Sequence, residues 1–160
     1  RLLGAGTLTR LAVAGKLIPF LKKKKFRGKP LIGQLGGWAK KALPLWGKKL
    51  VTYHKNWIYF TKTFGLNVIQ EVEPKPAIPP SPKSIRKLIN TMSRQRIPVI
   101  LAANFYDESK VRKVCRRVKA KSVIVAFSVA GKRGITSYHK LVDHWIKGLL
   151  KAYRKAGAIK

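Results

Sequence analysis

The sequence predicts an α/β fold, with about four parallel strands flanked by helices and an irregular basic arm before them. From about residue 48, apolar strand-like runs alternate with amphipathic helix patterns. Because a strand, a helix and a second strand of one sheet form a βαβ unit, this alternation favours a parallel sheet. With 160 residues, 46% of them hydrophobic, the chain is long enough for one domain with its own core.

Residues 1–46 are predicted to form the basic extended arm, and residues 47–160 the α/β lobe. The arm contains no acidic residue, and Pro19, Pro30 and Pro44 interrupt any long helix. Short helical pieces are expected at about residues 8–17 and 38–43.

The first βαβ unit of the lobe combines a strand at 49–53, an aromatic helix at 56–64 and a second strand at 66–72. Gly65 follows the helix in the C-cap position. Short strands that are mostly apolar are typical of a parallel sheet buried on both faces. A proline-rich loop then runs to Pro82.

The second half of the lobe continues the alternation of helix and strand. Ser81 is expected to cap a helix that starts at Pro82, and Asp107 a helix that runs to residue 119. The helix at 107–119 has one apolar side that includes Cys115, and cations around the other. The remaining elements are expected at residues 97–103 (strand), 122–127 (strand) and 137–155 (helix).

Net charge is the strongest compositional signal. The chain has 36 Lys and Arg against 5 Asp and Glu, a formal charge of +31 and a sequence pI near 11.1. Self-repulsion at this charge disfavours the compact state unless a polyanion neutralises it. Nucleic acid is the commonest such partner, and an anionic membrane surface the next. The residues expected to contact RNA phosphates are Lys22, Lys23, Lys24, Lys25, Arg27, Lys29, Arg112, Lys113, Arg116 and Arg117.

Four segments carry a family resemblance: TYHKNWIYFTKTFGL, EVEPKPAIPPSP, IPVILAANFYD and GITSYHKLVD. In this order and spacing they resemble the C-terminal lobe of the periplasmic substrate-binding proteins of zinc and manganese ABC transporters. The resemblance covers about residues 47–153 and only the second half of such a protein. It implies a Rossmann-like lobe with a metal site at the carboxyl ends of its strands.

The resemblance also implies ligand positions, which this chain fills incompletely. The family histidine falls on His54, a glutamate position falls on Ala103, and an aspartate position falls on Thr136. Neither of the last two supplies a carboxylate, and zinc wants about four ligands. His139 and His144 are five residues apart, so they do not form an i, i+4 pair and are expected to be surface or packing histidines. The expectation is therefore a relic position without a metal site.

These observations together predict a structural RNA-binding protein built on a lobe that has lost metal binding. The expected setting is a large ribonucleoprotein such as a mitochondrial ribosome, with rRNA and neighbouring proteins as partners and an organellar matrix as location. Residues 1–20 lack acids and carry three cations, as remnants of an organellar targeting sequence would. No cofactor, small-molecule substrate or catalytic residue is expected, and a membrane surface is disfavoured. The alternative is a periplasmic fragment of a zinc or manganese substrate-binding protein.

Overall fold

A computed structural model describes residues 10–11, 14, 16–73 and 80–160. The chain divides into two compact units, one of residues 1–48 and 58–67 and the other of residues 49–57 and 68–160. Half of the helix predicted at 8–17 and most of the proline-rich loop lie outside the described residues. The predicted boundary between residues 46 and 47 stays a prediction, since the first unit also takes in residues 58–67.

The first unit is made of short elements around a small apolar cluster. Leu17 and Leu21 are buried in it. A hairpin turn follows, in which Arg27 and Gly28 both have positive φ, as a tight two-residue turn requires. The elements are α2 (Leu17–Lys23), β1 (Lys25–Phe26), β2 (Lys29–Pro30), η1 (Leu31–Gln34), α3 (Gly37–Lys41), η2 (Leu43–Leu45) and α4 (Ile58–Thr63).

The second unit is built on a four-stranded sheet with the order β4-β3-β5-β6. β3 pairs in parallel with β5, and β5 with β6. The β4 strand joins on the other side of β3, where the N–H of Val72 donates to the carbonyl of Thr52 (2.9 Å). The bounds are β3 (Lys49–Thr52), β4 (Asn67–Glu71), β5 (Val99–Ala103) and β6 (Lys121–Val125). Strand alternation therefore predicted the α/β fold and its parallel sheet correctly.

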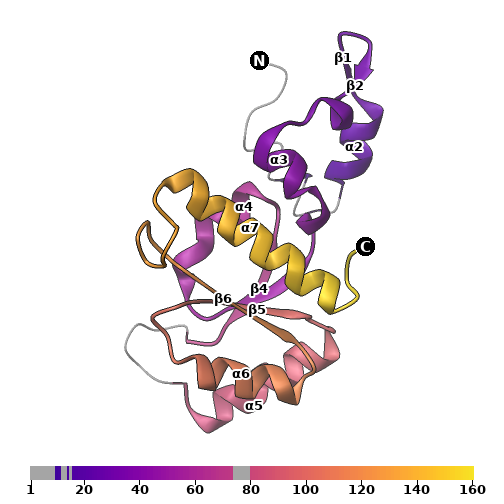
Figure 1. The fold of residues 1–160 in the computed structure, drawn as a ribbon. Helices are drawn as coiled ribbons and strands as arrows, with labels where there is room; N and C mark the ends of the chain where they lie inside the picture. The colour runs from indigo at the N-terminus through magenta and orange to yellow at the C-terminus, as the bar shows by residue number, and fades with distance from the viewer. Residues whose placement is uncertain (1–9, 12–13, 15, 74–79) are drawn as a thin grey trace. The chain divides into compact units, whose positions relative to one another are not determined.

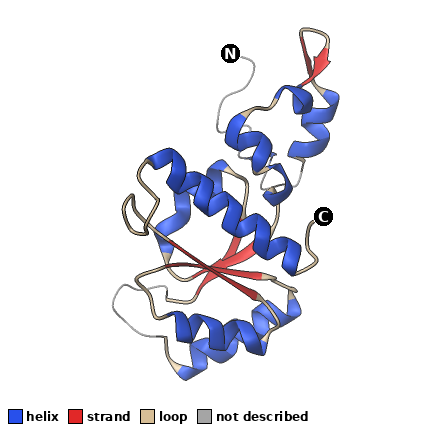
Figure 2. Cartoon of the chain, viewed as in Figure 1, coloured by secondary structure: helices blue, strands red, loops and turns tan. Residues whose placement is uncertain are grey.

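Helices cover both faces of the sheet (Figures 1 and 2). The α7 helix contacts β5 and β6 on one face, and α6 contacts the same strands on the other, with α5 packed beside α6. Because successive side chains of a strand point to opposite faces, Ile100 and Ala102 enter the core under α5 and α6. The helical bounds are η3 (Lys55–Trp57), α5 (Pro82–Arg94), α6 (Glu108–Arg117) and α7 (Tyr138–Lys155).

The helix starts follow from local sequence. Ser81 Oγ accepts from the N–H of Ser84 at 3.1 Å, and Pro82 takes the first position of α5. Asp107 caps α6 as predicted. At the far end of α7, the Tyr153 hydroxyl donates to the carbonyl of Lys49 (2.9 Å), so the last helix is fixed to the start of β3. Among the described residues, no helix is long and apolar enough to span a membrane.

Candidate metal centre

The candidate centre lies where the parallel strands end. His54 follows β3 by two positions, and Asn104 follows β5 directly. Open α/β sheets bind their ligands at the carboxyl ends of the strands, outside the sheet. His54, identified from the sequence as the family ligand position, therefore stands at the edge of the sheet where such a site belongs.

The His54 ring is held by one short hydrogen bond. Its Nδ1 lies 2.6 Å from the backbone carbonyl oxygen of Glu73, and the ring is half-buried. A carbonyl oxygen only accepts, so Nδ1 carries the proton and donates. In the neutral ring this leaves the lone pair on Nε2, which is the arrangement of a metal-binding histidine oriented by a backbone carbonyl.

Two tyrosines and a carboxylate flank this histidine. The rings of Tyr53 and Tyr106 pack with their centroids 4.2 Å apart. The Tyr106 hydroxyl donates to Asn56 Oδ1 at 3.2 Å. Burial, and then the charge of the Glu73 carboxylate, raises the pKa of both phenols above the ordinary value. The tyrosines are therefore neutral near pH 7, and Glu73 is the carboxylate that acts on both of them.

Asp107 belongs to the helix cap. Its Oδ1 accepts from Ser109 Oγ (2.7 Å) and from the N–H of Ser109 (2.9 Å). The side-chain hydrogen bond from Ser109, followed by the backbone N–H groups of Ser109 and Lys110, lowers the pKa of this carboxyl. The expectation that Asp107 begins the helix at α6 is confirmed.

The two other family positions supply no ligand. Ala103 is fully buried at the end of β5, and the Thr136 hydroxyl accepts from Lys140 Nζ at 2.9 Å. His144 is engaged elsewhere, since its Nε2 accepts from the N–H of Ala126 at 3.4 Å. In the described part of the chain, no three or more His, Cys, Asp or Glu residues gather where they could hold a metal ion.

The cations predicted to contact phosphate are exposed, and they are divided between the two units. Those of the arm lie on α2, at its C-cap Lys24, on β1 and β2 and in the turn between these strands, in the first unit. Those of residues 112–117 lie on α6, in the second. Sequence reasoning missed the part played by Glu73. Its signal was topological: Glu73 follows the strand that neighbours β3, and neighbouring parallel strands end at the same edge.

Several solved structures have the same fold as this chain. One is the substrate-binding protein FpvC of Pseudomonas aeruginosa with Mn²⁺ (23% identity, TM-score 0.57, 69% of this chain and 41% of that one). A second is the periplasmic zinc-binding protein TroA of Treponema pallidum (21%, TM-score 0.58, 71% and 45%). A third, a mutant laminin-binding adhesin of Streptococcus agalactiae, matches at 17% identity (TM-score 0.55, 70% and 44%). The chain thus spans less than half the length of these proteins.

The family model described as "Zinc-uptake complex component A periplasmic" matches residues 32–152. This range is roughly three quarters of the chain, and it includes His54 and both lost ligand positions. No curated protein matched the chain. The resemblance inferred from the four sequence segments is therefore confirmed, and the match extends into the region that was predicted to be only a basic arm.

These findings overturn the predicted ribonucleoprotein. The matching family model is that of a periplasmic zinc-uptake component, so the interpretation as an RNA-binding component of a mitochondrial ribosome, with rRNA and assembly partners in an organellar matrix, is wrong. Net charge describes the field of the whole molecule, whereas function depends on particular sites placed on a fold. The alternative, a fragment of a substrate-binding protein, fits better. The chain belongs to the family of periplasmic zinc-uptake complex component A proteins.

Proposed function

We propose that this chain is one lobe of a periplasmic substrate-binding protein that delivers a divalent metal ion, zinc or manganese, to an ABC uptake transporter. His54 is the ligand that this lobe contributes. The proposal is supported by the family match over residues 32–152 and by neighbours whose own ligands are zinc or manganese. In it the metal ion is the transported substrate and no resident cofactor takes part.

The single observation that carries the proposal is the orientation of the His54 ring. Donation from Nδ1 to the Glu73 carbonyl at 2.6 Å fixes the tautomer and leaves Nε2 as the coordinating atom. The half-buried ring has already lost part of its rotational freedom, so binding a metal costs less entropy than it would at a free surface side chain.

Electrostatics around His54 also favour a cation more than the overall charge of +31 suggests. Glu73 acts on both neighbouring tyrosines, and Asp107 also acts on Tyr53. Two of the chain's 5 acidic residues therefore lie within electrostatic reach of this end of the sheet. A local negative field offsets part of the long-range repulsion of a metal ion, because salt screens distant charges more than near ones.

The described residues of this chain do not complete a metal coordination shell. Zinc is commonly bound by about four ligands, and the described residues offer one well-placed imidazole. The chain covers 41–45% of the metal-binding neighbours from Pseudomonas and Treponema. The remaining ligands are proposed to come from a second lobe and from water, which makes the affinity of this lobe alone weak.

Calorimetric titration with zinc and with manganese tests the proposal. The wild-type chain, His54→Gln and the matched control His139→Gln are compared, since the control removes an exposed imidazole elsewhere in the same unit. Loss of His54 is expected to weaken metal binding by about tenfold or more, while the control stays within about twofold. Equal affinities for wild type and His54→Gln would contradict the proposal.

A further inference from the structure

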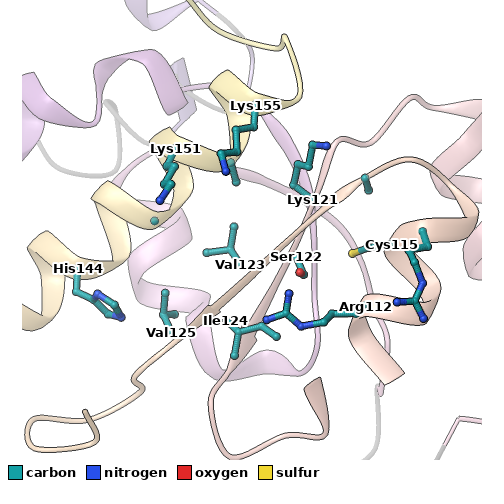
Figure 3. Close-up of a pocket in the computed structure, with 14 residues that line it drawn as sticks. Arg112, Cys115, Lys121, Ser122, Val123, Ile124, Val125, His144, Lys151 and Lys155 are labelled. Atoms are coloured by element: carbon teal, nitrogen blue, oxygen red, sulfur yellow. The ribbon is translucent and has the colours of Figure 1, made fainter. Parts of the chain in front are cut away.

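A cavity of about 450 Å³ runs along the free edge of β6, between α6 and α7 (Figure 3). Among the residues that the structure describes, β6 is the last strand of the sheet and pairs with β5 alone. The volume falls within the range of about 300–1,000 Å³ that is usual for binding pockets. This cavity is not part of the candidate metal centre, because His54 does not line it.

Within the described part of the chain, the backbone of β6 presents unpaired donors and acceptors to this cavity. The N–H of Lys121 donates to the carbonyl of Pro98 (2.8 Å), and the carbonyl of Val125 accepts from the N–H of Asn104 (2.9 Å). In a parallel pair, alternate residues direct their backbone groups to the same neighbour. Residues 121, 123 and 125 therefore bond toward β5, and the N–H and C=O groups of Ser122 and Ile124 point out of the sheet.

Cations from three elements surround this edge. None of the chain's acidic residues lines the cavity. Only one of the cations is neutralised by a described carboxylate: Arg112, whose Nη2 lies 2.9 Å from Glu108 Oε2. All five cations are exposed, and Figure 3 labels four of them: Arg112, Lys121, Lys151 and Lys155. The five are Arg112 and Arg116 on α6, Lys121 on β6, and Lys151 and Lys155 on α7.

The floor of the cavity is apolar. Val123 and Val125 are buried beneath α7, and Cys115 is a buried residue of α6. Gly148 brings α7 close to the strand, since a Cβ there would lie 3.3 Å from a methyl carbon of each valine. Burial raises the pKa of the Cys115 thiol to about 11, so it is neutral at pH 7 and acts as an apolar wall. A ligand here meets an apolar strand edge inside a ring of positive charge.

We propose that the β6 edge binds an acidic, extended peptide segment of a partner protein, which adds to the sheet as a further strand. A peptide backbone satisfies both the donors and the acceptors of Ser122 and Ile124, whereas a phosphate group offers acceptors alone. Side chains of an added strand point alternately to the two faces. They would meet the cations of α6 on one face and those of α7 on the other.

Charge also selects against the commonest alternative, pairing between two copies of this chain. Both edges would carry Lys121 and its cationic neighbours, and like charges across a strand pair are destabilising. An acidic segment, by contrast, is attracted by these cations. This site depends neither on His54 nor on metal binding, so the peptide proposal and the transport proposal can be tested independently.

Fluorescence anisotropy with a labelled peptide of alternating Glu and Val, about seven residues long, tests the proposal. A second peptide has the same sequence but carries N-methyl groups on alternate backbone nitrogens, which keeps the charge and removes strand pairing. The unmodified peptide is expected to bind about tenfold or more tightly than the N-methylated one. Equal binding of the two would reduce the interaction to general charge attraction and overturn the proposal.

Two matched triple variants locate the interaction on the molecule. The first variant removes three cations of the cavity through Arg116→Gln, Lys121→Gln and Lys151→Gln. The second removes three exposed cations of α5 through Lys83→Gln, Arg86→Gln and Lys87→Gln. The first variant is expected to lose about tenfold or more in peptide affinity, and the second about twofold at most. Circular dichroism and the melting temperature establish that both are folded.

Equal losses in the two triple variants would overturn the proposal, because the effect would then follow net charge alone. A second result would also overturn the proposal: the peptide does not bind, whereas tripolyphosphate binds and loses affinity when the three cations of the cavity are removed. Glu108→Gln releases Arg112 from its ion pair and is expected to tighten peptide binding by about twofold. A weakening in Glu108→Gln would contradict the part assigned to Arg112.

Discussion

The imidazole of His54 donates through Nδ1 to the backbone carbonyl of Glu73, 2.6 Å away. The two residues are far apart in sequence and meet because β3 and β4 are neighbours in a parallel sheet and end at the same edge. This contact is formed by the backbone of Glu73, so its side chain can vary without loss of the hydrogen bond. Glu73 therefore has two separable parts: its carbonyl orients the ring, and its carboxylate sets the local charge.

Restoring the lost carboxylates is expected to strengthen metal binding. Thr136→Asp places a carboxylate at an exposed family position, and Ala103→Glu places one at the end of β5. The double variant should bind zinc on the order of tenfold or more tightly than wild type, because carboxylate ligands complete part of the coordination shell. Calorimetric titration measures the gain.

The stability of the same variant provides the control. Ala103 is fully buried, so a glutamate there is expected to lower the free energy of unfolding by at least about 1 kcal/mol without metal. Zinc should recover stability through linkage if the carboxylate becomes a ligand. A variant that is destabilised equally with and without zinc would argue against the carried-over positions.

Trp145 is expected to be a main anchor of α7. Its Nε1 donates to the carbonyl of Ala126 at 2.6 Å, and its ring packs edge-on to Trp57 with a centroid distance of 5.0 Å. Trp145→Phe should lower the free energy of unfolding by about 1–2 kcal/mol, because a buried carbonyl loses its donor. Urea denaturation measures the loss. Tyr59→Phe, on a side chain 88% exposed, should change it by less than about 0.5 kcal/mol.

His144 is expected to make stability fall on mild acidification. Burial, and then the charge of Lys132, lowers its pKa below the ordinary 6.5. The unfolded chain therefore takes up this proton first, so the stabilising contribution is complete above about pH 7 and is lost as the pH falls below about 6.5. His144→Gln keeps an acceptor for the N–H of Ala126 and should show a smaller loss of stability between about pH 7 and 5. An unchanged pH dependence in that variant would contradict this assignment.

Much of the fold was predictable from the sequence because each element carries a local signal. The start of α5 is marked by Ser81 and Pro82, and the start of α6 by Asp107. Both helices begin within one residue of the predicted position. The strands of the second unit are apolar and short, which distinguishes them from the longer amphipathic helices. The first unit was less predictable. Its Pro and Gly residues interrupt regular elements, but they do not show that residues 58–67 group with residues 1–48.

The site was predictable only in part, for a physical reason. His54 was identified through its family segment, but its partner is a backbone carbonyl, which leaves no mark on residue type. The function was mispredicted because a charge of +31 describes long-range attraction and says little about a site made of a few ligands. In the sequence, the cations beside β6 contribute only to the net charge. The strand order and the cavity lining are needed to place Lys121 and Lys151 at the same open edge of the sheet.

The most direct test of the account follows the three imidazoles of the chain by nitrogen NMR during a zinc titration. The account predicts that the Nε2 resonance of His54 moves or broadens at the lowest zinc concentrations, with its Nδ1 still protonated, while His139 and His144 respond weakly or later. Zinc that leaves His54 unchanged, or that binds first at another histidine, would contradict the claim that His54 is the metal ligand of this lobe.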